Sequence, residues 1–381
     1  MALDFLTPLN SDILNYVKEL SSQHLGSKIV FHTQDDFPDL KKIKIALVGV
    51  LENRGGENID QPIDLSHIRK EFYNLYPGNW NISIADLGNL EPGEKIEDTY
   101  FAIQKLTSFL LKNNIIPIVI GGSQDITYPL YRAYDSLEQM VNVVSIDNKF
   151  DFLRENGVLS NSYLTRMIVD EPHNLFNYSN IGYQTYLNSQ EEIDVLEKLF
   201  FESYRLGEIS NDPAISEPIF RDGNLVSIDL HAVKSSDSGN LINFSPNGFS
   251  GKEICALSRY AGISDKISCL GIFNHQSSKQ ESVLISQILW YFIEGIHCRS
   301  NEYPFGSKHE YIKYTVTLEE DLVFYKSNIT NRWWIEITII TNKDNKLKKS
   351  TLFPCSHHDY LSACQGEVPE RWWKNQRKNL I

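Results

Sequence analysis

The sequence predicts an α/β protein: a three-layer α/β/α fold with a parallel, doubly wound sheet, followed by a C-terminal antiparallel β extension. Short apolar runs, of the kind that form strands covered on both faces, recur up to about residue 300. Amphipathic helical patterns lie between these runs, and strands that alternate with helices imply a parallel sheet with right-handed crossovers. After about residue 305, β-branched and aromatic runs follow one another without helical patterns between them, which indicates an antiparallel meander.

The predicted strands of the parallel sheet are nearly continuous runs of apolar and β-branched residues, at positions 44–50, 115–121, 141–147, 224–229 and 267–273. Apolar residues at three- and four-residue steps predict helices over 96–111 and 283–293. Ser250 and Glu253 have the spacing of a capping box, which predicts a further helix over 254–260.

The extension is predicted to contain strands at positions 311–318, 321–326, 332–340 and 347–353. The basic, aromatic tail from Pro369 to Ile381 predicts a short helix. We therefore divide the chain into an α/β domain, residues 1–304, and a β-rich extension with a terminal helix, residues 305–381. Alternation along a strand puts Trp333 and Trp334 on opposite faces, so at least one of them is expected in a core.

Composition narrows the classes of function. The formal net charge of −13 disfavours a nucleic-acid partner, because phosphate binding depends on clustered lysine and arginine. The chain starts without a basic segment followed by an apolar stretch, and it has no run of about 18 apolar residues that would span a bilayer. We therefore expect a cytoplasmic protein with no membrane span.

Three of the predicted strands end in acidic and polar residues, in the segments Gly-Gly-Ser-Gln-Asp at 121–125, Ser-Ile-Asp-Asn-Lys-Phe-Asp at 145–151 and Ser-Ile-Asp-Leu-His at 227–231. The carboxyl ends of parallel strands meet at the crevice where α/β proteins bind ligands. The loop 53–58, which follows the first strand, could line the same crevice, and a glycine-rich turn is the alternative interpretation.

Residues from about 44 to 300 resemble the ureohydrolase family, which includes arginase, agmatinase and formimidoylglutamase. At its strand ends the family shows, in order, Gly-Gly-Asp-His-Ser, Asp-Ala-His-x-Asp and Asp-x-Asp elements. Here Gly-Gly-Ser-Gln at 121–124, Asp-Asn-Lys-Phe-Asp at 147–151 and Asp-Leu-His at 229–231 stand in the same order and context. The resemblance implies an arginase-like fold and, because family members form trimers or hexamers, a homo-oligomer.

The resemblance also implies which residues stand at the family's dinuclear manganese centre. Carried over position by position, the six ligand positions hold Gln124, Asp147, Lys149, Asp151, Asp229 and His231. Three carboxylates remain, both histidine positions are lost, and one carboxylate position holds a histidine. The family's late glutamate is absent from 272–275, and no histidine lies at 161–166, where the family has its proton-shuttling residue. We therefore predict a degenerate active site.

Three converging carboxylates repel one another, and a pair about 4 Å apart costs about 4 kcal/mol at an effective dielectric near 20. A lysine ammonium among them would supply the missing positive charge. We predict that Lys149 takes the place of one ion and pairs with Asp147 and Asp229. His231 then adds a second cation or a neutral hydrogen-bond partner.

These departures predict an arginase-fold pseudoenzyme, a non-catalytic binding or scaffolding protein with no metal cofactor and no catalytic residue. Two alternatives stay open. Oxygen donors of Gln124, Asp147, Asp151 and Asp229 could hold a single Mn²⁺, Mg²⁺ or Ca²⁺ ion, which would make the chain a divergent amidinohydrolase of a formimidoyl or guanidino compound. The extension could instead bind a protein partner, whose identity, like that of a ligand, the sequence does not give.

Overall fold

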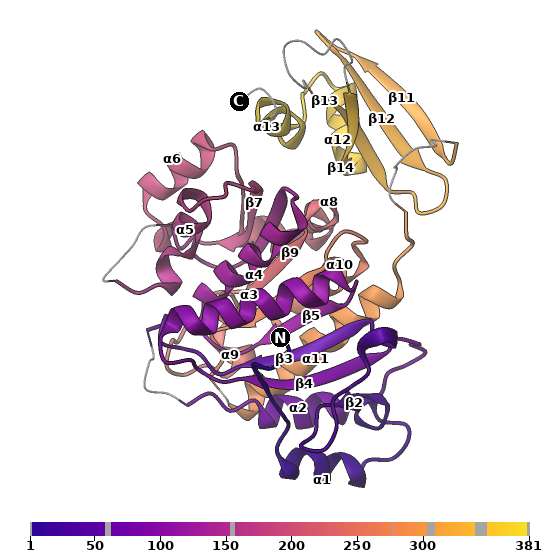
Figure 1. Ribbon diagram of the computed structural model, residues 1–381. Coiled ribbons are helices and arrows are strands. Elements are labelled where there is room, and N and C mark those ends of the chain that lie inside the picture. Colours follow the sequence, from indigo (N-terminus) through magenta and orange to yellow (C-terminus); the bar gives the residue numbers. More distant parts are fainter. Residues whose placement is uncertain are drawn as a thin grey trace.

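The computed structural model describes residues 2–57, 62–152, 157–276, 278–302, 309–339 and 349–378. These residues form one large, mainly parallel sheet with helices on both faces and a second, four-stranded antiparallel sheet (Figure 1). The predicted fold class is therefore confirmed, including the C-terminal antiparallel extension. The predicted division between residues 304 and 305 lies outside the described residues.

The strands of the large sheet are β1 (Leu6–Thr7), β2 (Val30–Phe31), β3 (Ile45–Val50), β4 (Ile84–Leu90), β5 (Ile116–Ile120), β6 (Val141–Ile146), β7 (Leu175–Tyr183), β8 (Glu202–Arg205), β9 (Leu225–Asp229) and β10 (Cys269–Phe273). The α-helices of this part are α1 (Ser11–Glu19), α2 (Ser66–Tyr73), α3 (Ile96–Lys112), α4 (Thr127–Arg132), α5 (Tyr163–Val169), α6 (Gln190–Lys198), α7 (Leu206–Asn211), α8 (Ser216–Asp222), α9 (Ser235–Ser238), α10 (Gly251–Ile263) and α11 (Lys279–His297). The extension contains β11 (Tyr311–Thr317), β12 (Asp321–Ser327), β13 (Trp333–Ile339), β14 (Lys349–Cys355), α12 (His357–Cys364) and α13 (Glu370–Lys378).

The large sheet is parallel through its middle. Neighbouring strands pair in the order β4, β3, β5, β10, β9, β6, β7 and β8, all in parallel, and the short β1 pairs antiparallel with β4 at one edge. Every residue of β3, β5, β6, β9 and β10 is buried, which is the physical reason for the continuous apolar runs that predicted these strands.

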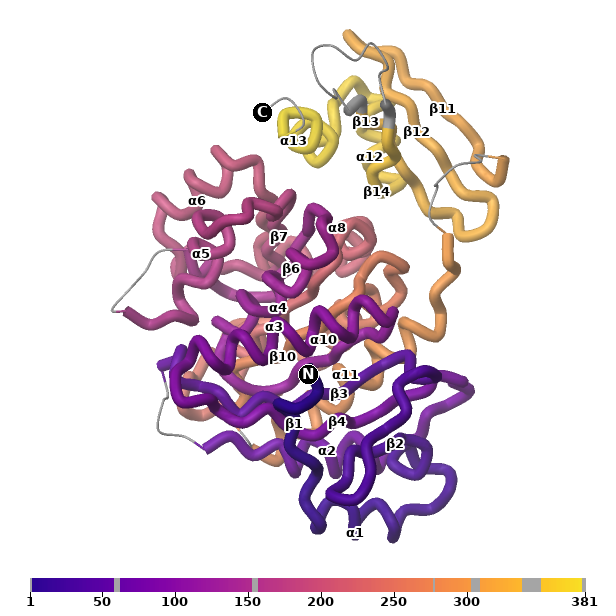
Figure 2. Tube along the Cα trace, in the orientation of Figure 1, coloured from indigo at the N-terminus to yellow at the C-terminus, as the bar shows by residue number. Residues whose placement is uncertain are grey.

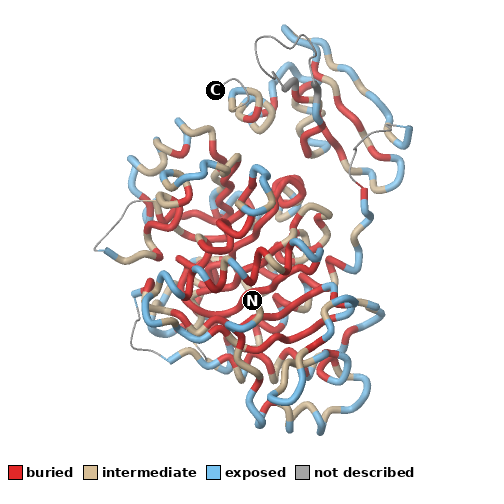
Figure 3. The backbone as a smooth tube through the Cα atoms, viewed as in Figure 1, coloured by how far each residue is buried: buried red, intermediate tan, exposed pale blue. Residues whose placement is uncertain are grey.

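Two hydrophobic cores, one on each face of the large sheet, hold the three layers together. On β3, alternation sends Ile45 and Leu47 to one core and Ala46 and Val48 to the other. Side chains of α2, α8, α10 and α11 complete the first core, and those of α3, α4 and α5 complete the second. The buried residues are concentrated along the strands between these layers (Figure 3).

The predicted helices are present with slightly longer bounds. α3 and α11 cover the predicted segments 96–111 and 283–293. α10 begins after Ser250, whose side chain accepts a hydrogen bond from the backbone N–H of Glu253 in the predicted capping box. Within the described ranges, none of the helices combines the length and the apolar composition needed to cross a bilayer.

The extension is a meander in which β11, β12, β13 and β14 each pair antiparallel with the next. Its four strands and the tail helix α13 confirm the elements predicted there. Trp333 packs in a core with Phe353 and with Ala363 of α12, whereas Trp334 is fully buried on the opposite face. Both tryptophans therefore stabilise the extension, one on each side of its sheet.

The extension docks at the amino ends of the large sheet's strands, beyond one end of the sheet (Figure 2). Arg221, which precedes β9, donates to the carbonyl oxygens of Trp333 and Cys355, both at 2.9 Å. In α13, Arg371 pairs with Glu202, the first residue of β8, at 2.9 Å. Buried hydrogen-bonded charges thus join the two sheets.

The pair formed by Glu202 and Arg371 predicts a pH dependence of stability. Burial opposes the charged carboxylate, but the Arg371 guanidinium and the Lys378 ammonium lower the pKa of Glu202 from 4.5 to about 2. Because the folded pKa lies below the ordinary value, the pair stabilises the fold above about pH 4.5 and loses that contribution as the pH falls toward 2. We expect Glu202→Gln to lower the free energy of unfolding by about 3 kcal/mol at pH 7 in urea titrations, with no difference near pH 2.

The exposed Glu197 provides the matched control for this measurement. A Glu197→Gln variant should keep the wild-type free energy of unfolding at both pH values. An equal loss in both variants would contradict the assignment of the effect to the ion pair.

Candidate functional site

A cavity of about 820 Å³ opens at the carboxyl ends of the middle strands of the large sheet. Its wall includes residues that directly follow β6 and β10 or end β9. These strands and β5 are neighbours in the sheet, so the three polar strand ends found in the sequence reach the same region. The cavity therefore lies at the crevice expected for an α/β protein.

Asp151 and Asp229 line this cavity, and the buried Asp147 meets them to form a cluster of three carboxylates. Asp147 follows β6, Asp151 lies four residues later, and Asp229 is the last residue of β9. One oxygen of each lies within 4.8 Å of the others, and all three residues are buried. Asp151 has a φ of 52°, a left-handed conformation that aspartate and asparagine tolerate better than most residues.

The three carboxylates differ in their hydrogen-bond partners. Asp229 accepts from the backbone N–H of His231 and from Asn274 Nδ2, both at 2.7 Å, and His231 Nδ1 lies 3.4 Å from its Oδ1. Asp147 Oδ1 accepts from the backbone N–H of Lys149 at 2.9 Å. Asp147 Oδ2 is buried and has no hydrogen-bond donor among the described residues. That oxygen is left for a shared proton, a water molecule or a cation.

The electrostatics of the cluster follow from burial and like charge. Burial, with the neighbouring Asp151 and Asp229, raises the pKa of Asp147 well above its usual value. Burial and Asp229 raise the pKa of Asp151 to about 7. Burial opposes ionisation of Asp229 as well, but the facing His231 lowers the pKa of Asp229 below its usual value. Burial likewise opposes the charged form of His231, but Asp229 raises the pKa of His231 above its usual value. The cluster thus contains more carboxylates than His231 pairs with, and the raised pKa values of Asp147 and Asp151 are the result of burial and of their repulsion.

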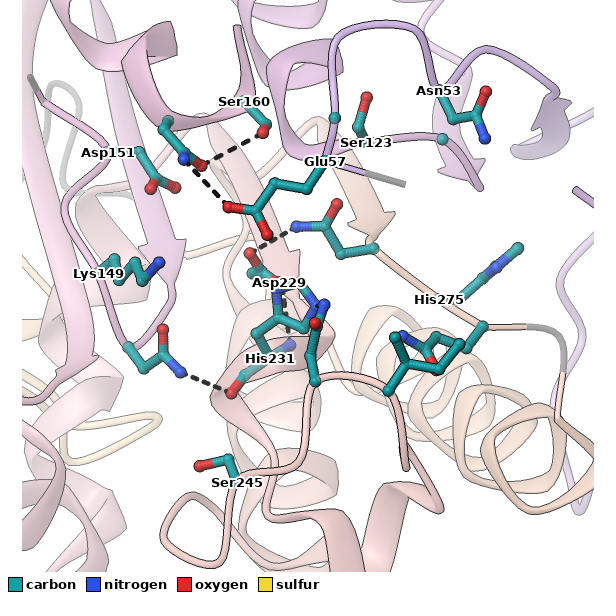
Figure 4. Close-up of a pocket in the computed structure, with 18 of the residues that line it drawn as sticks. Asn53, Glu57, Ser123, Lys149, Asp151, Ser160, Asp229, His231, Ser245 and His275 are labelled. Carbon is teal, nitrogen blue, oxygen red and sulfur yellow. Dashed lines mark hydrogen bonds and ion pairs between the residues drawn. The ribbon is translucent and has the colours of Figure 1, made fainter. Parts of the chain in front are cut away.

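Lys149 does not form the predicted contact. Its side chain lines the cavity, where Figure 4 shows it beside Asp151 and Asp229, but no ion pair joins it to any described carboxylate. Its charge still contributes to lowering the pKa of Asp151 against the stronger effects of burial and Asp229. An ammonium is strongly hydrated, and extending into an open cavity avoids the cost of desolvation. The prediction that Lys149 pairs with Asp147 and Asp229 is therefore wrong.

Gln124 and His231 are placed close to the predicted strand ends. Gln124 is fully buried and its Nε2 donates to Ser227 Oγ on β9 at 2.9 Å, while its Oε1 has no donor in the described part of the chain. Asn243 Nδ2 donates to His231 Nε2 at 2.9 Å, which requires the imidazole tautomer with its proton on Nδ1, the nitrogen that faces Asp229. His231 thus links Asp229 to a neighbouring loop.

The loop 53–58, which the sequence offered as a wall of the crevice, lines the cavity, whereas Asn161, Asn243 and Asn274 were not predicted to line it. Glu57 reaches the cavity from the loop after β3, and Asn161 Nδ2 donates to its Oε1 at 3.3 Å (Figure 4). Asn53 and Gly56 line the cavity too, which supports the interpretation of this loop as a crevice wall, although Asn58 lies outside the described residues. Asn274 directly follows β10, at the strand end where the family has its late glutamate. Its place at that strand end was the feature of the sequence that could have identified it as a residue of the site.

Comparison with known proteins identifies a family model that matches the chain and solved structures with a similar fold. The model of the arginase family matches residues 57–263, more than half of the chain. The formimidoylglutamase of Bacillus subtilis has a TM-score of 0.63 at 15% identity, covering 73% of this chain and 93% of the other. The formiminoglutamase of Trypanosoma cruzi solved with Mn²⁺ has a TM-score of 0.60 at 15% identity, covering 69% and 97%. The agmatine ureohydrolase of Thermoplasma volcanium has a TM-score of 0.57 at 17% identity, covering 74% and 97%. No curated protein sequence matches the chain.

Repulsion within the cluster predicts that removing one carboxylate stabilises the metal-free chain. We expect Asp151→Asn to raise the free energy of unfolding by on the order of 2 kcal/mol at pH 8 in the presence of a chelator. Because the folded pKa of about 7 exceeds the ordinary 3.8, wild-type stability should fall as the pH rises from about 4 through 7, and the variant should not show this loss.

Urea unfolding between pH 4 and pH 8 measures the difference, with the exposed Asp35→Asn as the control. Asparagine suits the left-handed backbone of position 151, so the substitution adds no strain there. A variant that is less stable than the wild type at pH 8 would show that the carboxylate makes a net favourable contact.

Proposed function

The chain belongs to the arginase family, and we propose that it is a non-hydrolytic member that binds an organic cation, an amine or an amidine, in the cavity at the strand ends. The observation that supports this proposal is the convergence of three buried carboxylates at the cavity floor. One oxygen of each of Asp147, Asp151 and Asp229 lies within 4.8 Å of the others. Among the described residues, the basic side chain that pairs with this cluster is His231, which faces Asp229. A ligand that carries a positive charge would relieve their repulsion.

The donor set does not fit two metal ions. Of the six positions carried over from the family, Lys149 holds an ammonium, which donates hydrogen bonds and accepts none. His231 Nδ1 faces Asp229, so it adds a possible positive charge beside that carboxylate. The Gln124 amide has its Nε2 committed to Ser227. Hydrolysis in the family relies on two Lewis-acidic ions acting together, and these residues do not supply the ligands for both.

The cavity is suited to holding a small polar molecule. Its volume of about 820 Å³ lies in the range of small-molecule sites, and Glu57, Asp151 and Asp229 line it together with Lys149 and His231. Both charge signs are therefore present on the wall. A cationic group would bind at the carboxylates, and an anionic group of the same ligand would find Lys149.

A second candidate is a hydrolase that uses one hard metal ion. Asp147, Asp151 and Asp229 offer converging carboxylate oxygens, and Gln124 Oε1 and Asp147 Oδ2 have no described donor. All-oxygen sites of this kind suit Mg²⁺, Ca²⁺ or Mn²⁺. When bound, one ion would supply Lewis acidity that polarises the oxygen or nitrogen of a carbonyl-like or amidine group. This is the divergent amidinohydrolase left open by the sequence.

Binding and turnover assays distinguish the two candidates. We expect agmatine to bind the wild-type chain in titration calorimetry and to bind Asp229→Asn at least about tenfold more weakly, because the charge-paired carboxylate is lost. The exposed Asp35→Asn should leave binding unchanged. Urea, formamide and ammonia should stay at background levels with agmatine or formimidoylglutamate, with or without added Mn²⁺. Manganese-dependent release of any of these products would instead establish the hydrolase.

Restoring the family's ligand set tests the argument from the donor set. We expect the triple variant Gln124→His, Lys149→His and His231→Asp to hold two Mn²⁺ ions per chain, because imidazole and carboxylate replace an amide, an ammonium and an imidazole. Metal analysis after equilibrium dialysis should find at most one ion per wild-type chain. Two ions per wild-type chain would overturn the proposal.

A further inference from the structure

A group of exposed apolar side chains surrounds part of the cavity mouth. This group, which we name the collar, consists of Tyr186, Leu187, Leu241, Ile242 and Phe244. Leu241 is 79% exposed, Tyr186 70% and Phe244 65%. Four of the five line the cavity, and Leu241 lies outside it. Contiguous exposed apolar side chains on a soluble protein mark sites of interaction.

Hydrogen bonds hold the two segments of the collar together. Tyr186 and Leu187 belong to a short 3₁₀ helix (Thr185–Leu187) that follows β7, and the other three lie on the loop between α9 and α10. Asn247 of that loop donates from Nδ2 to Gln184 Oε1 at 3.0 Å, and Gln184 Nε2 donates to the Asn247 carbonyl oxygen at 3.2 Å. The two segments therefore form one surface.

The loop of the collar is also tied to the cavity floor. Asn240 Oδ1 accepts from the backbone N–H groups of Ile242 and Asn243, which folds the loop on itself. Asn243 Nδ2 lies 2.9 Å from His231 Nε2, and His231 faces Asp229. One set of contacts thus connects the apolar rim with the acidic floor, so both are presented to an incoming ligand at once.

The position of the collar, partly outside the cavity, indicates which kind of ligand could cover it. A free amine or amidine inside the cavity would leave Leu241 uncovered, because that side chain lies outside the wall. Covering the collar requires a ligand that extends over the rim, as a protein segment does. The floor carries Glu57, Asp151 and Asp229, and the whole chain has a net charge of −13, so a basic group is complementary. Lys149 and His231 line the same wall beside these carboxylates (Figure 4).

We propose that the cavity mouth is a docking surface for a protein partner, which inserts a lysine or arginine side chain into the cavity and packs neighbouring apolar residues on the collar. The proposal rests on the proposed function, because the inserted side chain is the organic cation that the floor accepts. A central polar contact enclosed by apolar contacts that exclude water is the usual arrangement of an interface hot spot.

The test is the selection of peptides from a displayed random dodecapeptide library on the immobilised full-length chain. We expect the enriched peptides to contain one lysine or arginine with apolar residues on either side. Synthetic copies with norleucine in place of the basic residue should bind at least about tenfold more weakly in titration calorimetry. Failure to enrich peptides, or enrichment of peptides without a basic residue, would overturn the proposal.

Two variants locate the peptide on the surface. Leu241→Ser should weaken peptide binding at least about tenfold and leave agmatine binding within about twofold, because Leu241 lies outside the cavity wall. Val169→Ser with Ile329→Ser changes two residues that are each 64% exposed elsewhere, and it should change neither. Circular dichroism and thermal melting verify that both variants fold. Unchanged peptide binding in the collar variant would overturn the proposal.

The outcomes separate this inference from the proposed function. If agmatine binds and the library gives no basic peptide, the docking surface falls and the proposed function stands. If neither agmatine nor a peptide binds, both fall. A wild-type oligomer that the collar substitution dissociates in light scattering would assign the surface to a second copy of the chain and would also overturn the proposal.

Discussion

Three carboxylates that meet inside the protein impose the constraint around which the site is arranged. Asp147 and Asp229 stand at the ends of β6 and β9, which pair with each other and are fixed by the cores on both faces, so neither can move away. Burial makes their repulsion stronger than it would be at a surface. His231 and Asn274 satisfy Asp229, whereas Asp147 keeps an oxygen without a described donor. The floor is therefore suited to accept one more positive charge, and the cavity gives a cation access to it.

The sequence predicted most of the fold because the signal for a buried parallel sheet is local. A strand covered on both faces must be apolar at nearly every position, and β3, β5, β6, β9 and β10 show this in their own residues. The convergence of Asp147, Asp151 and Asp229 followed from the same signal, since the carboxyl ends of parallel strands share one edge. The orientation of the Lys149 side chain could not be predicted in the same way. It depends on the balance between ion pairing and hydration inside the cavity, and the sequence does not give the shape of that cavity.

The residues that sequence reasoning missed lie on irregular segments. Asn243 stands in a loop without hydrophobic periodicity, so no pattern marks it as a neighbour of His231 and Asp229. Leu241 and Phe244 are single apolar residues in a polar loop. The folded structure shows that this loop contacts the segment that carries Tyr186, and that contact places the apolar residues on one surface. A site built on loops that a rigid sheet positions is common in α/β proteins, and it limits what one sequence can reveal.

The extension and the cavity lie at opposite ends of the same strands. Arg221 and Glu202, which hold the extension, stand just before β9 and at the start of β8, whereas Asp229 ends β9 and faces the cavity. A five-residue strand such as β9 is roughly 16 Å long, which separates the two surfaces by more than the reach of a side chain contact. The extension therefore leaves the collar open, and its buried ion pair stabilises the sheet without supplying a group to the acidic floor. A ligand in the cavity and a partner on the extension would consequently contact separate surfaces.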